Sequence, residues 1–477
     1  KLQNLFTYPT IKELAQFVKE GKRSIYQRIE KLPPKKYYKL SYAQKRLWIL
    51  NQLNPESSAY NMNLQIKLNE KVDMAILERV VETMVQRHES LRTSFRVIDD
   101  FPVQIINDKA ETNIVTYDIS QLNGEEQEDE RNRIFEEMNR PYNLRVDEIF
   151  RIGLIKLAEN EYEIITTMHH IISDGWSMDI ITKEFKLLYS GYKEKEEIHL
   201  EPLRIQYKDF AAWQNDLILN TESSKEAKEF WKKQVTGEIT GLNLPTNSIS
   251  GEEYEKKTSA LRFTLQKEVK DGLKEIAKEN NVSLYAVLIT GLKMYLSKKT
   301  RQEDILIGTA SAGRQHDDLS GVVGYFVNTL ILRNYILWDQ PFIELLASIN
   351  KNIQQALEYQ YYPLELIVEE ENISYPEITV FFNMLNIGDG SQELLEDFGT
   401  IHQEESQEAK FEIAFYVREY QNGLAFTVTY HSYKYDDFTI QHITDEYLKT
   451  LEKIADNPKI SLNDLKRNKK KKIFKRR

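Results

Sequence analysis

A strand pattern that runs directly into two adjacent histidines constrains this chain more than any other feature. Residues 161–168 (EYEIITTM) are mostly β-branched and apolar, which predicts a strand buried in a sheet. His169 and His170 follow at once, residues 174–175 (Asp-Gly) predict a turn, and Ser177 is a typical N-cap for the amphipathic helix predicted after it. The two histidines therefore lie where a strand ends and a helix is about to begin.

Adjacent residues on a strand point to opposite faces of the sheet. Only one of His169 and His170 can therefore face a reaction space, and their rings cannot converge on one metal ion. The alternation of side chains does not decide which of the two histidines faces the reaction space. An imidazole is mostly neutral at pH 7 and can accept a proton, so the residue that faces this space is a candidate base.

The composition indicates a soluble chain with more than one core. A length of 477 residues exceeds that of a usual single core, which predicts two domains or subdomains. The hydrophobic content of 41% suits packed cores and the charged content of 29% suits a solvated surface. Because no apolar run reaches the roughly 18 residues of a membrane helix and no signal-peptide pattern opens the chain, we expect a cytoplasmic protein without membrane contact.

The absence of cysteine and the net charge exclude several kinds of chemistry. A chain without cysteine has no disulfide framework, no thiolate nucleophile and no cysteine-ligated zinc, and we expect no metal site. The net charge of -10 argues against a general nucleic-acid partner. Residues 466–477 (KRNKKKKIFKRR) form a basic run, which we interpret as a solvated tail.

Predicted strands and helices alternate loosely through two comparable halves, 40–200 and 201–465, joined by a connector over 189–214. The first half predicts helices at 42–54, 74–88 and 124–139 and strands at 60–68, 93–97, 150–157 and 161–168. The second half predicts strands at 259–265, 305–310, 329–335, 378–385, 411–419 and 424–431, and helices at 267–279, 284–298, 342–359 and 440–455. This order predicts an α/β fold of mixed sheets covered by helices. Residues 21–39 contain Pro33-Pro34 and predict an extended linker.

Residues 169–175 (HHIISDG) resemble the HHxxxDG core of the condensation domains of nonribosomal peptide synthetases, which belong to the chloramphenicol-acetyltransferase-like superfamily. Further motifs of that family occur in the same order, so the resemblance spans roughly residues 40–465. They are 41–50 (SYAQKRLWIL), 87–95 (RHESLRTSF), 207–213 (YKDFAAW), 324–333 (GYFVNTLILR) and, more weakly, 359–365 (YQYYPLE). The last motif of the family, rich in Arg and Asp, is not recognisable at 374–386 (SYPEITVFFNMLN).

This resemblance implies a fold and a set of residue roles. Two acetyltransferase-like lobes form a V-shaped pseudo-dimer, and the active site lies in a tunnel between them. The second histidine of the motif, His170, faces that tunnel, whereas His169 is structural. Asp174 supports the loop, and Gly175 places a backbone N–H near the acyl group.

The resemblance also suggests partners for Asp174 and a tunnel lining. Asp174 is expected to pair with Arg314 of the segment 312–314 (AGR), and Arg92 of the second motif is a rival partner. The tunnel-lining candidates are Asn328, Thr329, Ser177 and Trp176. An Asn-Thr pair also suits the start of a strand, and Trp176, Trp48 and Trp213 are also predicted to pack in a core.

Residues 1–20 resemble the last helix of a peptidyl carrier protein, with its LFxxPTIxxLA ending, but lack the Gly-Gly-Asp-Ser stretch that carries phosphopantetheine. The implied partners are therefore an upstream donor carrier protein fused at the N-terminus and downstream adenylation and acceptor carrier domains. The carriers would deliver their own phosphopantetheine arms, so no cofactor is expected to be bound permanently. We expect a monomeric module.

The implied reaction is amide formation between a carrier-bound acyl or peptidyl thioester and the amine of a carrier-bound aminoacyl thioester. An epimerisation domain shares the double histidine, but its DxxSW pattern differs from residues 174–177 (DGWS). A stand-alone acyltransferase using acyl-coenzyme A, and a hydrolase built from Ser173, His170 and Asp174, are alternatives, although no GxSxG motif accompanies that serine. A non-catalytic carrier-recruiting module would be expected to lose the second histidine.

Overall fold

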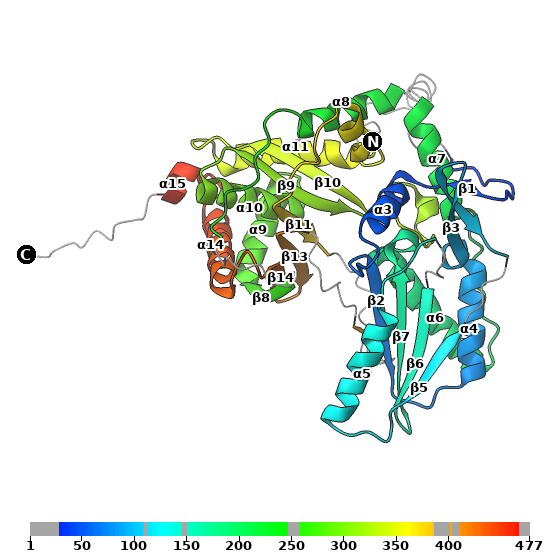
Figure 1. The fold of residues 1–477 in the computed structure, drawn as a ribbon. Helices are drawn as coiled ribbons and strands as arrows, with labels where there is room; N and C mark the ends of the chain where they lie inside the picture. The colour runs from blue at the N-terminus through cyan, green and yellow to red at the C-terminus, as the bar shows by residue number, and fades with distance from the viewer. Residues whose placement is uncertain are drawn as a thin grey trace, which may run out of the picture.

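The structure, a computed structural model, describes residues 28–108, 113–145, 150–220, 222–246, 258–385, 401–402 and 411–466. Its elements form two lobes, each built on one mixed sheet, that diverge like the arms of a V (Figure 1). The predicted α/β class, with helices covering mixed sheets, is confirmed. The predicted carrier remnant at 1–20 and the basic tail from residue 467 on lie outside the described residues.

The amino-terminal lobe is built on a five-stranded sheet of order β12-β2-β7-β6-β5. Its strands are β2 (Asn61–Leu68), β5 (Ile114–Asp118), β6 (Phe150–Ala158), β7 (Glu161–His169) and β12 (Ile401–His402), and its helices are α4 (Met74–Arg87), α5 (Glu125–Met138) and α6 (Gly175–Glu194). Strand β7 lies between β2 and β6, and every residue from 163 to 169 is buried. Burial on both faces explains why this strand shows no alternation of apolar and polar residues.

A helix and a small sheet stand beside this lobe. Helix α3 (Tyr42–Leu53) begins with a capping box, in which Ser41 and Gln44 each satisfy a backbone N–H of the other. The small sheet has the order β1-β4-β3 and contains β1 (Tyr38–Lys39), β3 (Thr93–Ile98) and β4 (Phe101–Ile106). Strand β2 of the five-stranded sheet lies between β1 and β3 along the chain, and α3 contacts the turn that carries His170.

The carboxy-terminal lobe has a six-stranded sheet of order β10-β9-β11-β13-β14-β8. Its strands are β8 (Thr258–Gln266), β9 (Asp304–Ser311), β10 (Asn328–Tyr335), β11 (Val380–Met384), β13 (Ile413–Tyr420) and β14 (Gly423–His431). Its helices are α9 (Lys267–Glu279), α10 (Leu284–Thr300), α11 (Phe342–Glu358), α12 (Leu364–Glu370), α14 (Asp437–Asp456) and α15 (Leu462–Lys466). Two further helices, α7 (Tyr207–Asn220) and α8 (Glu222–Val235), follow the amino-terminal lobe in the chain.

Buried apolar side chains gather mainly in two cores, one per lobe. One core is formed by residues from Leu217 to Leu465, and the other by residues from Leu40 to Tyr189 together with Val323. A third cluster packs α7 and the residues before it against residues 319–326, and we call it the α7 cluster. Its members are Ile29, Ile205, Tyr207, Phe210, Ala211, Leu319, Val322 and Phe326.

Two segments differ from their predicted arrangement. The sequence predicts a linker at residues 21–39, but Ile29 is fully buried in the α7 cluster and the Leu32 N–H donates to Asp209 at 2.9 Å. Strand β12, from the second half of the chain, pairs antiparallel with β2 of the amino-terminal sheet. Both contacts join residues far apart in sequence, so local patterns could not predict them.

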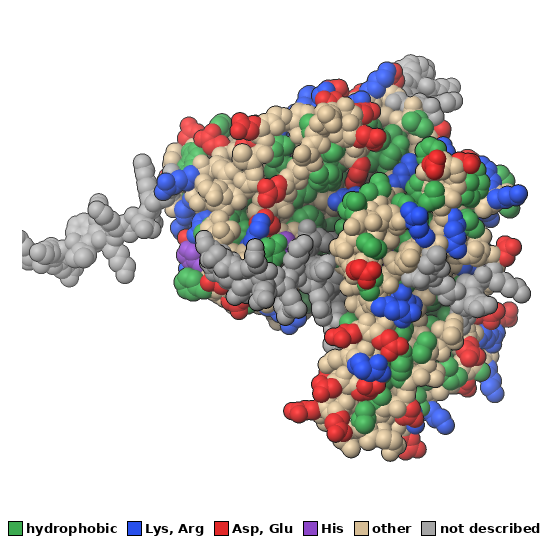
Figure 2. All heavy atoms as spheres, in the orientation of Figure 1, with side chains coloured by type: hydrophobic (Ala, Val, Ile, Leu, Met, Phe, Trp, Pro, Cys, Tyr) green, Lys and Arg blue, Asp and Glu red, His purple; other side chains and the backbone are tan. Residues whose placement is uncertain are grey.

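The surface carries charges of both signs. On the face shown in Figure 2, acidic and basic side chains are interspersed over both lobes. Within the described ranges, no helix is long and apolar enough to cross a membrane.

Candidate active site at the interface of the lobes

His169 is a buried, hydrogen-bonded side chain at the end of β7. It faces Asn61 across the ladder with β2 and is 2% exposed. Its Nδ1 accepts a hydrogen bond from the Ile171 N–H at 3.1 Å, and its ring meets Tyr142 edge to face at 6.1 Å. These contacts support the structural role that the motif implies for the first histidine.

His170 lies outside the strand and is partly exposed. It opens the short turn η2 (His170–Ile172), and its Nδ1 lies 2.7 Å from the Ser173 carbonyl oxygen. Because a carbonyl oxygen only accepts, Nδ1 carries the hydrogen in the neutral ring and Nε2 carries the lone pair. The ring packs edge to face on Tyr325, from the second half of the chain, at a centroid distance of 4.9 Å. His170 thus stands at the interface of the lobes as a potential proton acceptor.

Asp174 is the N-cap of α6, and the prediction that Ser177 is the N-cap is wrong. The helix begins at Gly175, and Asp174 Oδ1 accepts from the Ser177 N–H at 2.8 Å. Ser177 instead occupies the third position of the helix, where its hydroxyl lies 2.7 Å from the same carboxylate oxygen. Asp and Ser cap helices about equally well, so their sequence could not decide which of the two does so here.

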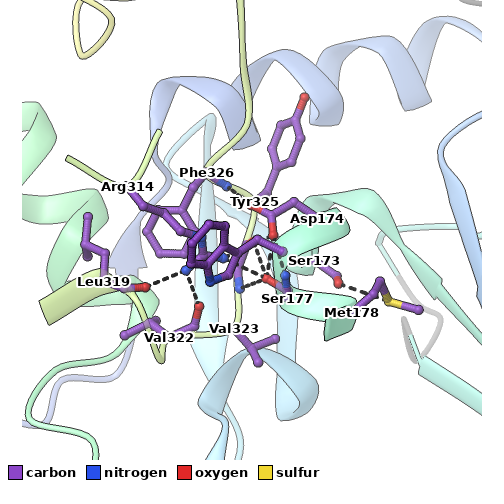
Figure 3. Close-up of polar contacts among 12 residues, drawn as sticks. Ser173, Asp174, Ser177, Met178, Arg314, Leu319, Val322, Val323, Tyr325 and Phe326 are labelled. Carbon is purple, nitrogen blue, oxygen red and sulfur yellow. Dashed lines mark hydrogen bonds and ion pairs between the residues drawn. The ribbon is translucent and has the colours of Figure 1, made fainter. Parts of the chain in front are cut away.

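The start of α6 binds the backbone of the second half of the chain. Asp174 Oδ2 accepts from the Phe326 N–H at 3.0 Å, and Ser177 Oγ accepts from the Gly324 N–H at 3.0 Å (Figure 3). The Ser177 hydroxyl also lies 3.0 Å from the Gly324 carbonyl oxygen. Asp174 and Ser177 therefore fix residues 324–326, which precede β10, against the helix that follows the histidines.

Arg314 completes this network, and its predicted pairing with Asp174 is present. Its Nη2 donates to Asp174 Oδ1 at 3.0 Å and to Ser177 Oγ at 2.9 Å. Its Nη1 donates to the carbonyl oxygens of Leu319 at 2.5 Å and Val322 at 2.6 Å (Figure 3). The side chain is only 3% exposed. Burial lowers the pKa of the Arg314 guanidinium from its ordinary value, while Asp174 favours its charged form.

Arg92 does not belong to the site, so the role predicted for it there is wrong. Its Nη1 donates to the Asn107 carbonyl oxygen at 2.6 Å, and its acidic neighbour is Glu89 at 3.9 Å. Arg92 ends the turn η1 (Glu89–Arg92), and its side chain extends toward the end of the β3–β4 hairpin. Arg92 and Asp174 thus both belong to motifs of the family, but their side chains do not pair in the structure.

A pocket lies between the lobes, with about 680 Å³ of empty space that includes open solvent. It is lined by residues of α3 and α7 and by the segments 313–316, 325–329 and 360–365, and Asn328 and Thr329 are among them. Asn328 Nδ2 donates to the Gln360 carbonyl oxygen at 2.7 Å, which fixes its side chain in the lining of the pocket. The ion pair between Arg46 and Glu365, 3.3 Å apart, also lines it.

The other two tunnel-lining candidates do not line this pocket. Ser177 is fully buried in the Asp174 network. Trp176 is 49% exposed, and its indole N–H donates to the Ser320 carbonyl oxygen at 2.9 Å, so its prediction as a core residue is wrong. Trp48 is buried in the amino-terminal core, whereas Trp213 is partly buried and lines the pocket.

Three residues of this site were missed by sequence reasoning. The Tyr207 hydroxyl donates to the Tyr325 carbonyl oxygen at 2.6 Å and lies 2.8 Å from Ser41 Oγ. Ser41, Tyr207 and Tyr325 belong to three separate motifs, so the motif order marked the segments without showing that they meet. Burial raises the pKa of Tyr207, which keeps its hydroxyl protonated as a donor.

Replacing Gly313 with alanine is expected to destabilise the fold by about 1–3 kcal/mol, because the residue has φ of 68° and a Cβ atom there would lie 1.9 Å from the Phe326 carbonyl oxygen. Unfolding in denaturant measures the loss. Gly321→Ala is the matched control, since its Cβ would approach only Leu203, at 3.3 Å. Equal stability of the two variants would contradict the prediction.

Comparison with known proteins identifies the family. A family profile described as "Condensation domain" matches residues 35–473. This chain belongs to the condensation-domain family. Among the curated relatives, tyrocidine synthase 3 of Brevibacillus parabrevis is 34% identical over 466 residues, which cover 97% of this chain and 7% of that protein. Surfactin synthase subunit 1 of Bacillus subtilis (strain 168) is 33% identical, over 97% of this chain and 13% of its own length.

Solved structures confirm the fold of this condensation domain. The X-domain from teicoplanin biosynthesis has a TM-score of 0.79 at 20% identity, covering 92% of this chain and 99% of that one. The first condensation domain of the calcium-dependent antibiotic synthetase, solved with a substrate analogue, has a TM-score of 0.71 at 16% identity, covering 90% and 99%. The predicted resemblance to nonribosomal peptide synthetase condensation domains is thus confirmed. The chain spans only a small share of its curated relatives, so their whole activities are not assigned to it.

Proposed function

We propose that this condensation domain joins an upstream carrier-bound acyl or peptidyl thioester to the amine of a downstream carrier-bound aminoacyl thioester. The observation that carries the proposal is the His170 ring, which is partly exposed at the interface of the lobes. Its Nδ1 is fixed by the Ser173 carbonyl, so Nε2 is the nitrogen that can take a proton. Similarity to the synthetases of tyrocidine and surfactin supports the substrate class.

The proposed reaction is aminolysis of a thioester. The amine nitrogen attacks the thioester carbonyl carbon, and His170 Nε2 accepts the proton that the nitrogen loses. The carbon–sulfur bond then breaks, and the departing thiolate takes the proton from His170 Nε2, which returns the imidazole to its neutral form. The N–H groups of Gly175 and Trp176 open α6 ahead of the Ser177 N–H that Asp174 caps, and they lie at the positive end of the helix, which favours the developing oxyanion.

The expected partners follow from this reaction. The donor carrier would be fused upstream and the adenylation and acceptor carrier domains would lie downstream, in a cytoplasmic synthetase. Both substrates would arrive on phosphopantetheine arms of the carriers, so the domain would act as an acyltransferase with no cofactor bound permanently. We expect the module to act as a monomer.

A dipeptide-transfer assay tests this function. The wild-type domain is mixed with a donor carrier loaded with an aminoacyl group and an acceptor carrier loaded with a second one, and the dipeptidyl acceptor is measured. Amide formation that requires both loaded carriers supports the proposal. Transfer from acyl-coenzyme A would instead indicate a stand-alone acyltransferase, and scrambled chirality on a single carrier would indicate an epimerase.

The hydrolase alternative finds no support in the site. Ser173 is fully buried, and its hydroxyl lies 3.6 Å from Met178 Sδ. The carboxylate of Asp174, the acid of that hypothetical triad, accepts hydrogen bonds from Arg314, Ser177 and the Phe326 N–H instead. Release of free acid from the donor carrier without an amine acceptor would be the result that revives this alternative.

A recruiting module is the second candidate, because the similar teicoplanin X-domain has also been solved as a complex with OxyB. Such a module would bind loaded carriers without forming an amide. Binding in the absence of any transfer, with both carriers verified as loaded, would favour it. The presence of His170 and its partly exposed ring favour catalysis.

Replacing Gly175 with valine is expected to lower the transfer rate by about 10- to 100-fold without changing the melting temperature, because it displaces the acyl group. A Cβ atom at Gly175 would meet nothing within 4 Å, so the added side chain would extend into open space at the start of α6. Transfer kinetics and thermal unfolding are measured together. Gly175→Ala should lower the transfer rate less than Gly175→Val does. Wild-type kinetics in Gly175→Val would show that the acyl group does not lie at this position.

A further inference from the structure

Tyr325 lies between His170 and the pocket. Its ring meets the His170 ring edge to face, with centroids 4.9 Å apart and planes at 64°. The same residue lines the pocket together with Arg46 and Glu365. Tyr325 therefore connects the His170 ring to the lining of the pocket.

The backbone around Tyr325 is fixed by three hydrogen bonds from other parts of the chain. The Gly324 N–H donates to Ser177 Oγ and the Phe326 N–H donates to Asp174 Oδ2, each at 3.0 Å. The Tyr325 carbonyl oxygen accepts from the Tyr207 hydroxyl at 2.6 Å. With its neighbours held on both sides, the Tyr325 ring has a defined place, and it points away from the Asp174 network in Figure 3.

The Tyr325 hydroxyl has no hydrogen-bond partner among the described residues. It is also absent from the set of fully buried polar atoms that lack a partner, so it is accessible. The charged groups that influence the pKa of Tyr325 include Arg46 and Glu365, which line the pocket. Burial raises the pKa of Tyr325 above its ordinary value, an effect that Arg46 opposes. The hydroxyl therefore stays protonated and can donate a hydrogen bond.

We propose that the ring of Tyr325 is a positioning group for the His170 imidazole and that its hydroxyl donates a hydrogen bond to a carbonyl oxygen of a carrier-bound substrate in the pocket. The inference rests on the proposed function, because it names a contact for that substrate. A ring that only filled space in a core would have no need of an accessible hydroxyl, whereas each thioester or amide substrate brings carbonyl acceptors. The two parts of the side chain therefore have separable effects.

Two substitutions separate the ring from the hydroxyl. Tyr325→Phe keeps the ring, so kcat for amide formation should stay within about 2-fold of wild type, while the KM of one loaded carrier should rise by about 3- to 10-fold from the lost hydrogen bond. Tyr325→Leu removes both groups and should also lower kcat by about 10- to 100-fold, since the imidazole loses its orientation. Tyr420→Phe, a half-exposed tyrosine of β13, is the matched control and should behave as wild type.

A second measurement is independent of activity. The His170 ring proton resonances, assigned by comparison with His170→Ala, should shift in Tyr325→Leu because the neighbouring ring is lost, and should stay near their wild-type positions in Tyr325→Phe. Melting temperatures show whether each variant folds, and Tyr325→Met replaces the leucine variant if that one does not fold.

The outcomes distinguish this inference from the proposed function. Unchanged KM values for both carriers in Tyr325→Phe would overturn the substrate contact. Wild-type kcat and an unshifted His170 resonance in Tyr325→Leu would overturn the positioning role. A wild-type domain that forms no amide would instead contradict the proposed function, while the His170 resonances would still report the contact between the rings.

Discussion

Replacing His170 with alanine is expected to lower kcat for amide formation by about 10²- to 10⁴-fold, the usual contribution of a general base. The imidazole is held by the Ser173 carbonyl with Nε2 as its proton acceptor, and alanine removes that acceptor. Because His170 is partly exposed and follows the end of β7, the substitution should leave the fold intact. Steady-state transfer with both loaded carriers measures the effect.

His442→Ala is the matched control for this experiment. His442 lies in α14, its side chain is 55% exposed, and it pairs with Glu446 on the same helix at 3.5 Å. The control should retain the wild-type rate. A His170→Ala variant that did the same would remove His170 from the reaction and leave positioning of the two carriers as the source of catalysis.

Replacing Asp174 with alanine is expected to destabilise the domain by about 3–5 kcal/mol, because it leaves the buried Arg314 guanidinium without its countercharge. It also removes the acceptor of the Phe326 N–H and the N-cap of α6. The free energy of unfolding, measured in denaturant, gives the loss. Asp118→Ala is the control, since that carboxylate is exposed and pairs with Lys156 at the surface, and its effect should be far smaller.

A double-mutant cycle tests whether the loss comes from the Asp174–Arg314 pair. Arg314→Met removes the charge that Asp174 neutralises, so the combined variant should be destabilised by less than the sum of the two single changes. Additive losses would mean that the pair contributes no coupling. In that case the cost of Asp174→Ala would have to come from the lost N-cap and the unpaired Phe326 N–H.

Most elements of regular structure could be predicted because their signals are local. The apolar run at 161–168 became β7, and the helix predicted at 267–279 matches α9. Strand β12 has two residues, too few to show a period, and its partner β2 lies more than three hundred positions away. The buried Ile29 in the predicted linker was missed for the same reason, since the residues of its cluster lie far away in the sequence, at 205–211 and 319–326.

The sequence indicated several residues of the site but only some of the contacts between them. The motif identified His169, His170 and Asp174, and its order along the chain suggested Arg314 as a partner. The same evidence left Arg92 as a rival partner, because a sequence motif carries no information on distances, and the structure places Arg92 against the Asn107 carbonyl oxygen instead. The sequence also placed Trp176 in a core, whereas the indole is half exposed and binds the Ser320 carbonyl.

The sequence by itself determined the fold class, the family and the histidine pair, because strand periodicity, helix spacing and ordered motifs are all properties of neighbouring residues. Only the tertiary structure decided which groups surround His170. The Asp174 network joins the start of α6 to residues 324–326 and so places Tyr325 on the imidazole. These residues are separated by about 150 positions, and packing of the two lobes, rather than any local preference, brings them into contact.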